Sequence, residues 1–261
     1  MNNKSIVFLM VGISLLCLTG LILAGHGAYV KVKASTSVNQ GRAYAKQHQY
    51  SQAIDAFSQS LQLSPHQPKV LAYRGFCFDK TKQYPLAIQD FSKALSMTSA
   101  HDEDSRAFCA STYYYRGMSY DRLHRDREEI ADLRSVISLL PEGMHRSSPI
   151  YSQANNGIAW IRATSPDATM RDGADAIHYA QTAVDFAQGS HAPAYCIDTL
   201  AAAEARAGQF AQAVANQQRA IAMLSRIHDL IEVQQMQQRL HLYQQGMPYT
   251  TDYSAKGLGQ K

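Results

Sequence analysis

The chain repeats one short pattern at a distance of 34 residues. Residues 49–61 read QYSQAIDAFSQSL and residues 83–95 read QYPLAIQDFSKAL, with seven identical positions between them. The same distance relates Gly41 to Gly75, upstream of the two segments. A fixed period of this length is typical of proteins that stack one supersecondary unit on the next. The pattern therefore predicts a repeat protein, in which each unit is stable only against its neighbours.

The composition favours helices for these units. Hydrophobic residues make up 46% of the 261 residues and charged residues 18%, which is ordinary for a globular protein. Alanine and glutamine are frequent, and alanine has the highest helix propensity. The net charge is +4, with basic residues interleaved with acidic ones. A dense basic block of the kind that binds nucleic acid is absent from the sequence.

A third copy of the pattern begins at Gly117, which lies 42 residues after Gly75. The eight additional residues are best placed in Ser99–Arg106, a polar segment that contains the sequence HDED. Glu129 occupies a position that is alanine in the first two copies. A bulky charged side chain there predicts either looser helix packing or a shifted register that uses Ala131.

Small and aromatic residues recur at fixed places in the three copies. Glycine or alanine on one helix allows a second helix to approach, and a large side chain of that helix then fills the gap. The residues at these places are Gly41, Tyr44, Ala53, Phe57 and Ser60, then Gly75, Phe78, Ala87, Phe91 and Ala94, then Gly117, Tyr120, Leu133 and Val136. This arrangement resembles the tetratricopeptide repeat family. The resemblance implies antiparallel helix pairs that stack into a superhelix.

Two further units are expected downstream. Residues 155–163 read NNGIAWIRA and residues 198–203 read DTLAAA. These segments resemble a variant of the family that is frequent in bacterial proteins, with Asn-Asn, Ala-Trp, Ala-Thr-Cys-Pro-Asp and Asp-Thr-Leu-Ala-Ala-Ala segments. Here Ser165 stands where cysteine is common in that variant. The resemblance implies about five helix pairs over residues 34–218.

The last part of the chain is predicted to close the array. Apolar residues recur at spacings of three to five over residues 219–245, which indicates an amphipathic capping helix with a glutamine-rich outer side. Gly246 and Pro248 are expected to end this helix. Residues 246–261 are predicted to be a flexible tail.

The first part of the chain holds an uncharged apolar run of 19 residues, Ile6–Ala24. As a helix it would span about 28 Å, close to the thickness of a bilayer core. We therefore expect a transmembrane helix and assign residues 1–33 to a membrane anchor and linker. Cleavage before Ala28, after small residues, is one alternative. Lipid attachment at Cys17 is another, which the bulky Leu16 disfavours.

The side of the membrane is suggested by the flanking charges. Lys4 and the terminal amine favour a cytoplasmic start, whereas Lys31 and Lys33 just beyond the run act in the opposite sense. A short basic start followed by one apolar run is typical of an export signal. The bulk of the chain is therefore expected on the extracytoplasmic, periplasmic side in preference to the cytoplasm.

Signatures of catalysis and metal binding are missing from the sequence. The ten histidines are scattered, without the i, i+4 pair of a zinc-binding helix or a cysteine at ligand spacing. Phosphate-binding glycine loops and the serine-nucleophile motif are absent. Cys77, Cys109 and Cys196 are predicted to be buried free thiols. The sequence thus favours a protein that is not an enzyme and has no cofactor or metal, with an enzyme of unrecognised site as the remote alternative.

The resemblance also implies a concave groove lined by the first helix of each pair. Aromatic residues together with arginine and lysine are the types that anchor protein partners. The candidate groove residues are Arg42, Lys46, Tyr73, Phe76, Lys80, Tyr114, Met118, Arg122, Trp160 and Arg206.

One binding mode of the family is not expected in this chain. Some members hold a partner's terminal carboxylate with a clamp of lysine, asparagine and arginine. The corresponding positions here are Val38, Arg42, Tyr73, Ser111 and Tyr115. Only Arg42 is cationic, so the groove is predicted to bind an extended or helical peptide partly through apolar contact.

These observations predict an all-α, helix-turn-helix repeat solenoid with an N-terminal transmembrane helix through residues 6–24. The predicted function is a scaffold that binds partner proteins or peptides on its concave face at the membrane. A processed periplasmic or secreted adaptor in envelope or secretion-system assembly is the alternative. Nucleic acid and metal are not expected as partners.

Overall fold

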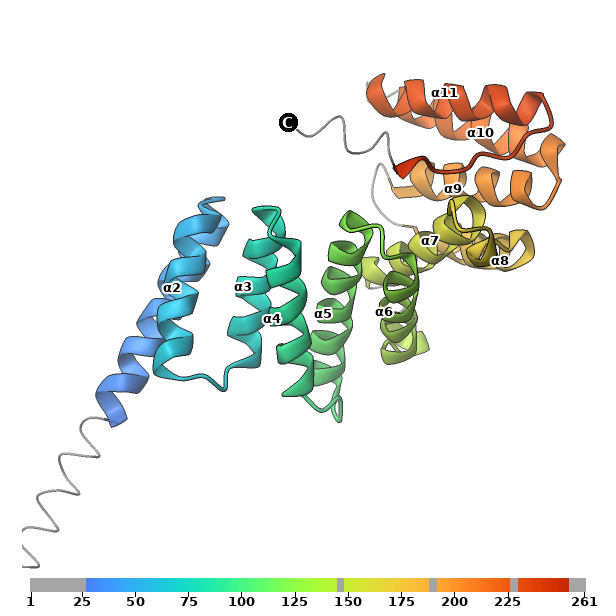
Figure 1. Ribbon diagram of the computed structural model, residues 1–261. Helices are drawn as coiled ribbons and strands as arrows, with labels where there is room; N and C mark the ends of the chain where they lie inside the picture. Colours follow the sequence, from blue (N-terminus) through green and yellow to red (C-terminus); the bar gives the residue numbers. More distant parts are fainter. Residues whose placement is uncertain (1–26, 145–147, 188–191, 226–229, 254–261) are drawn as a thin grey trace, which may run out of the picture. The chain divides into compact units, whose positions relative to one another are not determined.

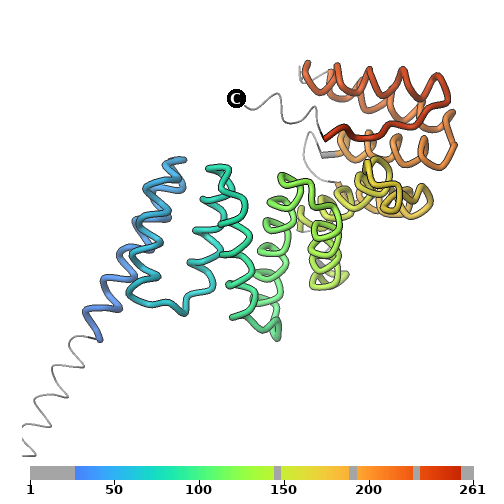
Figure 2. Tube along the Cα trace, viewed as in Figure 1, coloured from blue at the N-terminus to red at the C-terminus, as the bar shows by residue number. Residues whose placement is uncertain are grey.

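The computed structural model describes residues 27–144, 148–187, 192–225 and 230–253. Within these residues every regular element is a helix (Figure 1). The chain divides after Met97 into two compact units, which are considered separately below. In both units successive helices run back and forth and pack beside one another (Figure 2). The all-α helical repeat predicted from the sequence is thus confirmed.

Unit 1 contains the first two helix pairs. Residues 27–46 are helical and pair with α2 (Tyr50–Leu63). The second pair is α3 (Pro68–Lys80) and α4 (Tyr84–Ser96), each with a proline in its first turn, where the missing N–H is not needed. The helix over residues 27–46 includes residues 27–33, which the sequence assigned to a linker.

Unit 2 contains the remaining pairs and a terminal helix. Two short 3₁₀ helices, Glu142–Met144 and Ala168–Met170, lie in its connections. Its α-helices are α5 (Glu103–Arg122), α6 (Asp126–Leu139), α7 (Pro149–Thr164), α8 (Gly173–Phe186), α9 (Ala192–Arg206), α10 (Phe210–Ser225) and α11 (Leu230–Gln244).

The small residues of the repeat lie where the helices cross. A Cβ atom added to Gly41 would lie 2.6 Å from the ring of Phe57, and one added to Gly75 would lie 3.0 Å from the ring of Phe91. Both rings are almost completely buried. Each glycine therefore makes room for one aromatic side chain of its partner helix, as the repeat pattern predicts.

The third pair is packed less tightly at this crossing. A Cβ atom on Gly117 would meet its nearest neighbour, Cβ of Asp132, at 3.5 Å. Glu129 is buried at the position where the first two copies carry alanine, whereas Ala131 is exposed. The expected loosening is confirmed, and the alternative of a register shifted to Ala131 is wrong. The helix keeps its register because Ile130 and Leu133 bury their side chains on the same face.

The eight additional residues before the third pair lengthen a helix as well as a loop. Asp102 caps α5 by accepting a hydrogen bond from the amide of Ser105 at 2.7 Å, and the Ser105 hydroxyl accepts one from the amide of Asp102 at 3.1 Å. This reciprocal capping box satisfies two amides that have no partner inside the helix. The insertion, predicted over Ser99–Arg106, therefore contributes the first turn of α5.

The core of unit 2 is rich in alanine around α7–α10. Ala159 and Ala163 of α7 meet Ala176 and Ala180 of α8, and all four are fully buried. Alanine at these crossings brings the helix backbones close together, so dispersion contacts between the backbones replace those of large side chains.

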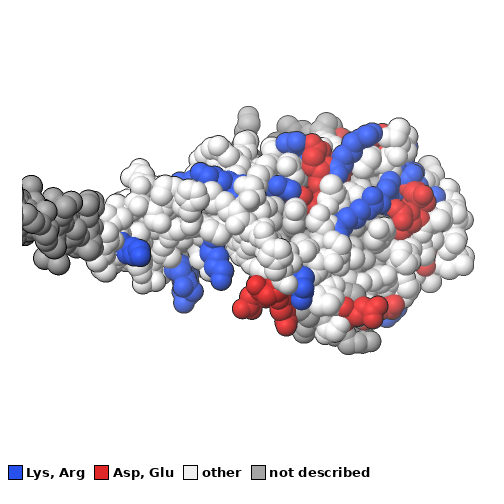
Figure 3. All heavy atoms as spheres, turned by 90° about the horizontal axis from the view of Figure 1, so that it is seen from below, with Lys and Arg blue, Asp and Glu red and all other residues white. Residues whose placement is uncertain are grey.

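Charged side chains of both signs lie next to one another on the face shown in Figure 3.

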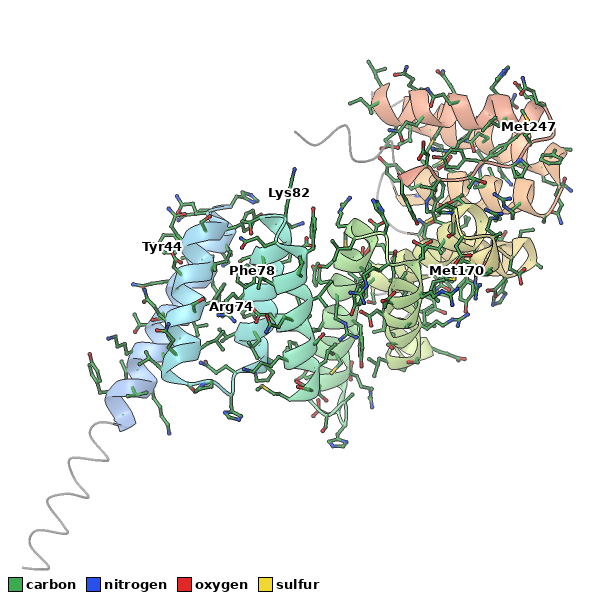
Figure 4. All side chains as sticks on the ribbon, viewed as in Figure 1. Tyr44, Arg74, Phe78, Lys82, Met170 and Met247 are labelled. Atoms are coloured by element: carbon green, nitrogen blue, oxygen red, sulfur yellow. The ribbon has the colours of Figure 1, made fainter. Side chains whose placement is uncertain are left out.

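The turns inside four helix pairs share one backbone conformation. His48, Lys82, His124 and Gly208 all have positive φ, between 56° and 80°. Lys82 stands at the turn between α3 and α4 and points away from both helices (Figure 4). This left-handed conformation ends a helix without strain only for glycine. Three of the four turns therefore carry backbone strain that glycine would relieve.

We expect Lys82→Gly to stabilise unit 1 and Gly208→Ala to destabilise unit 2. A left-handed residue other than glycine costs about 1–2 kcal/mol, and the greater entropy of unfolded glycine offsets part of this. The free energy of unfolding should rise by about 0.5 kcal/mol for the first change and fall by about 1 kcal/mol for the second. Chemical denaturation of both variants measures the effect. A fall for Lys82→Gly would contradict the assigned turn.

The predicted membrane anchor, residues 6–24, lies outside the residues that the structure describes. Among the described residues, none of the helices combines the length and the apolar character required to cross a bilayer. At the other end, the capping helix expected over 219–245 is divided. Its first part belongs to α10, and α11 begins at Leu230.

The segment after α11 differs from the flexible tail expected over 246–261. Residues 246–253 run back beside α9 in an ordered path (Figure 2). The backbone amide of Thr251 donates to the carbonyl of Thr164 at 2.8 Å, and the two threonine hydroxyls are 2.9 Å apart. Polar groups of this segment are thus satisfied by unit 2, which holds it in place. Residues 254–261 lie outside the described part of the chain.

Candidate functional site

Unit 2 contains a cavity of about 400 Å³ that is open to solvent. It lies between the first helices of the third, fourth and fifth pairs, α5, α7 and α9, and is completed by α6, α11 and Tyr253. Its lining residues are Asp121, Glu129, Asn156, Gly157, Trp160, Ile161, Thr164, Tyr195, Asp198, Thr199, Glu232, Gln235, Arg239 and Tyr253.

A buried ion pair lies in the wall of this cavity. Arg239 of α11 donates from Nε to Oδ1 of Asp198 at 3.0 Å and from Nη2 to Oδ2 at 2.9 Å. Asp198 also accepts a hydrogen bond from Gln217 at 2.7 Å. All three residues are buried. This pairing joins α9, α10 and α11, and it explains the aspartate of the DTLAAA segment as a structural residue.

Trp160 presents its ring to the same cavity from α7. The guanidinium of Arg239 lies 5.5 Å from the centre of this ring and 5.8 Å from the centre of the Tyr249 ring. A cation within about 6 Å of an aromatic face is attracted by the electrons of the ring. The Trp160 ring in the wall of the cavity therefore already contacts a cation of the chain itself, the guanidinium of Arg239.

A hydrogen-bond acceptor without a partner lies in the wall of the cavity. Oδ1 of Asn156 is buried and has no hydrogen-bond partner in the structure. Gly157, the next residue, allows α6 to approach, since a Cβ atom there would lie 2.7 Å from Leu133 and 3.7 Å from Oε1 of Glu129. A buried acceptor without a donor costs roughly 1–3 kcal/mol.

Two tyrosines near Glu129, Tyr114 and Tyr253, have raised pKa values. The pKa of Tyr114 is raised to about 12 by burial first, and then by Tyr115 and the charge of Glu129. The pKa of Tyr253 is raised by burial, by its hydrogen bond to Asp126, and by the charges of Glu129 and Asp121. Burial is the largest cause of both shifts, and neighbouring negative charge adds to it.

The rim of the cavity is held by the C-terminal segment. The hydroxyl of Tyr253 donates to Asp126, and its ring stacks on His124 with centroids 4.1 Å apart. Arg206 donates to the carbonyls of Ala163 and Tyr249, both at 2.6 Å. Arg206, predicted from the sequence as a groove residue, thus ties the segment to α7 and α9 and does not line the cavity.

We expect removal of residues 246–261 to destabilise unit 2, whereas removal of only 254–261 leaves its stability unchanged. The longer truncation takes away the carbonyl acceptor of Arg206 and the partner of the buried Thr164 hydroxyl. Losses of this kind should lower the free energy of unfolding by roughly 2–4 kcal/mol. Thermal unfolding of both truncated chains compares them. Equal melting temperatures would contradict the assigned role of the segment.

In unit 1 the predicted groove residues make cation–aromatic contacts, one between the two helix pairs and one within α3. The guanidinium of Arg42 lies 5.7 Å from the centre of the Tyr73 ring, which also stacks on Phe57 at 5.9 Å. The ammonium of Lys80 lies 5.0 Å from the centre of the Phe76 ring. Arg42, Tyr73 and Lys80 keep an exposed surface, as does Lys46. These residues form a cation–aromatic patch.

In unit 2 the structure brings one of the predicted residues into the cavity, namely Trp160. Tyr114 is half-buried beside the core of the third pair, Met118 is also half-buried, and Arg122 is exposed at the end of α5, 4.0 Å from Asp121. The prediction missed the contribution of α11. The glutamines of its outer side are exposed, as expected, and one of them, Gln235, also lines the open cavity together with Glu232 and Arg239.

The three described cysteines are buried in the helical core. Cys77, Cys109 and Cys196 are buried free thiols, as predicted. Burial raises the pKa of Cys77 to about 11, which suppresses its reactive thiolate form. Among the residues placed by the structure, His, Cys, Asp and Glu do not form a group that could hold a metal ion.

Comparisons with known proteins agree with this architecture. Residues 34–67 match the model of the tetratricopeptide repeat, a segment that covers the first helix pair up to the start of α3. This segment is therefore a tetratricopeptide repeat by sequence as well as by structure. No curated protein sequence matches the chain.

Several solved structures share the fold. BtubC from P. vanneervenii superposes with a TM-score of 0.59 at 13% identity, covering 77% of this chain and 92% of its own. MamA residues 41–end from Desulfovibrio magneticus RS-1 gives 0.57 at 16% identity, covering 76% and 97%. YrrB, described as a tetratricopeptide repeat protein with an unusual peptide-binding site, gives 0.57 at 13% identity, covering 77% and 90%. At these identities the similarity establishes a tetratricopeptide-like fold.

Proposed function

We propose that this chain is a protein-interaction scaffold, not an enzyme, that binds a segment of a partner protein in the cavity of unit 2. The observation that carries the proposal is the lining of this cavity by the first helices of three successive pairs, with the aromatic ring of Trp160 among the lining groups. Binding sites are typically concave, largely preformed and lined by aromatic side chains together with a few polar groups. The peptide-binding site described for YrrB supports the same use of the fold.

We further propose that residues 6–24 anchor the scaffold in a membrane, with the repeat on the extracytoplasmic side. The support is the length of the uncharged apolar run. Cleavage before Ala28 would instead release a processed adaptor. Membrane fractionation with and without an alkaline wash distinguishes the two, because an anchored chain stays in the membrane pellet and a processed chain is released.

A photo-cross-linking residue introduced at Gln235 tests the binding proposal. Gln235 is exposed and lines the cavity, whereas Gln237 is exposed on another side of the same helix and does not line it. A cross-linker at position 235 should join the full-length chain to a partner protein in its native cells. The same cross-linker at position 237 serves as the matched control. Equal cross-linking from both positions would contradict the assignment of the cavity.

A further inference from the structure

The C-terminal segment, residues 246–253, crosses three successive helix pairs of unit 2 and reaches the cavity (Figure 1). It leaves α11 at an exposed turn, where Gly246 has a φ of 71° and Met247 is 43% exposed (Figure 4). The segment then contacts α9, α7 and α6, and its Tyr253 is one of the residues that line the cavity. It therefore lies over the same three pairs that form the proposed binding site.

Burial along the segment alternates from one residue to the next. Tyr249 and Tyr253 are half-buried and Thr251 is buried, whereas Thr250 and Asp252 are exposed. A period of two is typical of an extended chain with one side against a surface. The segment thus presents two tyrosines, with a threonine midway between them, to unit 2.

The threonine of the segment satisfies polar groups at the end of α7. Thr164 is the last residue of this helix and is 1% exposed, and its carbonyl has no partner inside the helix. The amide of Thr251 donates to this carbonyl at 2.8 Å, and the Thr251 hydroxyl donates to the Thr164 hydroxyl at 2.9 Å. Any chain that replaced the segment would have to supply an N–H and an O–H donor here.

The two tyrosines of the segment occupy separate places on either side of Thr251. The ring of Tyr249 lies 6.0 Å from that of Trp160, between centroids, and packs against the alanine-rich core. The ring of Tyr253 stacks on His124, and its hydroxyl donates to Asp126. Buried aromatic rings that keep a polar group in contact with a partner are common anchors of bound segments.

The segment is held less firmly than the helices beneath it. Within residues 246–253, Thr251 is the one residue that is buried. Regions with little buried surface open locally at a lower free energy than the helical core does. Opening would uncover the contacts at Trp160, Thr164 and Asp126 without unfolding the repeat.

From these contacts we infer that the C-terminal segment is autoinhibitory, and that a partner segment displaces it and takes its place on unit 2. The partner segment is extended and carries a serine or threonine midway between an aromatic residue and a tyrosine. The inference rests on the proposed function, and it names the chemistry of the partner and the regulation of the site. While the C-terminal segment is in place, the affinity for the partner is reduced to the fraction of chains in which it is open.

A hexapeptide that copies residues 248–253, labelled at its amino end and amidated, is the probe for this surface. The control peptide has alanine in place of both tyrosines and of the second threonine, which keeps its length and charge. Fluorescence anisotropy on the full chain in detergent should show weak binding of the copy peptide, because the tethered segment competes at a high effective concentration. The control peptide should bind about ten times more weakly still.

The double variant Thr251→Ala, Tyr253→Ala weakens the tethered competitor. The copy peptide should bind this variant about ten times more tightly than the unaltered chain, because a larger fraction of chains is open. Asp252→Ala, at the exposed position between the two, is the matched control and should leave the affinity unchanged. Circular dichroism checks that the variants keep their helices. Equal affinity for the unaltered chain and the double variant would overturn the inference, as would equal binding of the control peptide.

Hydrogen exchange on the unaltered chain gives a second measurement that does not depend on a variant. The amide of Thr251 is hydrogen-bonded to Thr164 while the segment is in place, which slows its exchange. Saturation with the copy peptide should speed exchange over residues 246–253 by about fivefold or more, because the segment is displaced. Unchanged or slower exchange would show that the segment is a fixed part of unit 2 and would overturn the inference.

Cross-linking in cells separates this inference from the proposed function. From position 235, in the cavity that Tyr253 also lines, the double variant should capture about three times more partner than the chain with the unaltered segment. Equal capture by both chains, with position 237 giving less, would overturn the inference and leave the proposed function standing. Equal cross-linking from positions 235 and 237 would overturn the proposed function and the inference with it.

Discussion

Arg116→Ala is expected to lower the free energy of unfolding by about 3–5 kcal/mol. Arg116 of α5 donates to Asp132 of α6 through Nε at 2.8 Å and Nη2 at 2.7 Å, in a bidentate pair. Asp132 is buried, and its hydrogen bonds raise the pKa of Arg116. Without the guanidinium, Asp132 would be left as a buried carboxylate that has lost its ionic partner. Chemical denaturation measures the change.

The double variant Arg116→Met, Asp132→Leu is the control for this prediction. It removes both charges together and should recover most of the lost stability, because the penalty comes from isolating one charge. The equivalent pair Arg74–Asp90, which has the same spacing along the chain, should behave in the same way. Arg74 is labelled on α3 in Figure 4. If Arg116→Ala lowered the free energy of unfolding no more than the double variant does, the penalty could not come from an isolated buried charge.

Phe91→Ala is the second change for which we expect a large effect, a loss of about 3–5 kcal/mol in the free energy of unfolding. The ring of Phe91 is 1% exposed and lies against the backbone of Gly75. Because Gly75 has no side chain to move into the space, removal of the ring should leave a cavity that collapses poorly.

Leu86→Ala on the same helix is the matched control. Leu86 is 42% exposed, so its truncation removes little buried surface and should cost less than about 1 kcal/mol. Thermal and chemical unfolding of the two variants compare a repeat position with a surface position of α4. A comparable loss of stability in both would contradict the assigned register of the repeat.

The repeat fold could be predicted from the sequence because its signal is local and is repeated. The glycines at 41 and 75 face Phe57 and Phe91 as their spacing predicts. The turn residues were harder to recognise. His48, Lys82 and His124 adopt a left-handed conformation, which is unusual for these residue types and could not be predicted from them. Gly208 adopts the same conformation, which is common for glycine.

The candidate site was less predictable, because it depends on contacts between distant segments. Trp160 could be recognised as an aromatic residue on a first helix, but the carboxylates beside it come from α5, α6, α9 and α11. Arg206 was assigned to the groove from its repeat position, yet it donates hydrogen bonds to the C-terminal segment. The repeat pattern contains no information on that segment, since the segment is not part of a repeat.

The central claim is that a segment of a partner protein binds in the cavity of unit 2, and Trp160 offers the most direct test. It is the one tryptophan of the chain and lines the cavity. The full chain should be saturated with a tryptophan-free peptide of the partner segment that the cross-linker at position 235 captures, while tryptophan emission is recorded. We expect a saturable change in the intensity and wavelength of Trp160 emission, with the affinity that anisotropy gives. Saturation by anisotropy without any change in Trp160 emission would show that the peptide binds elsewhere.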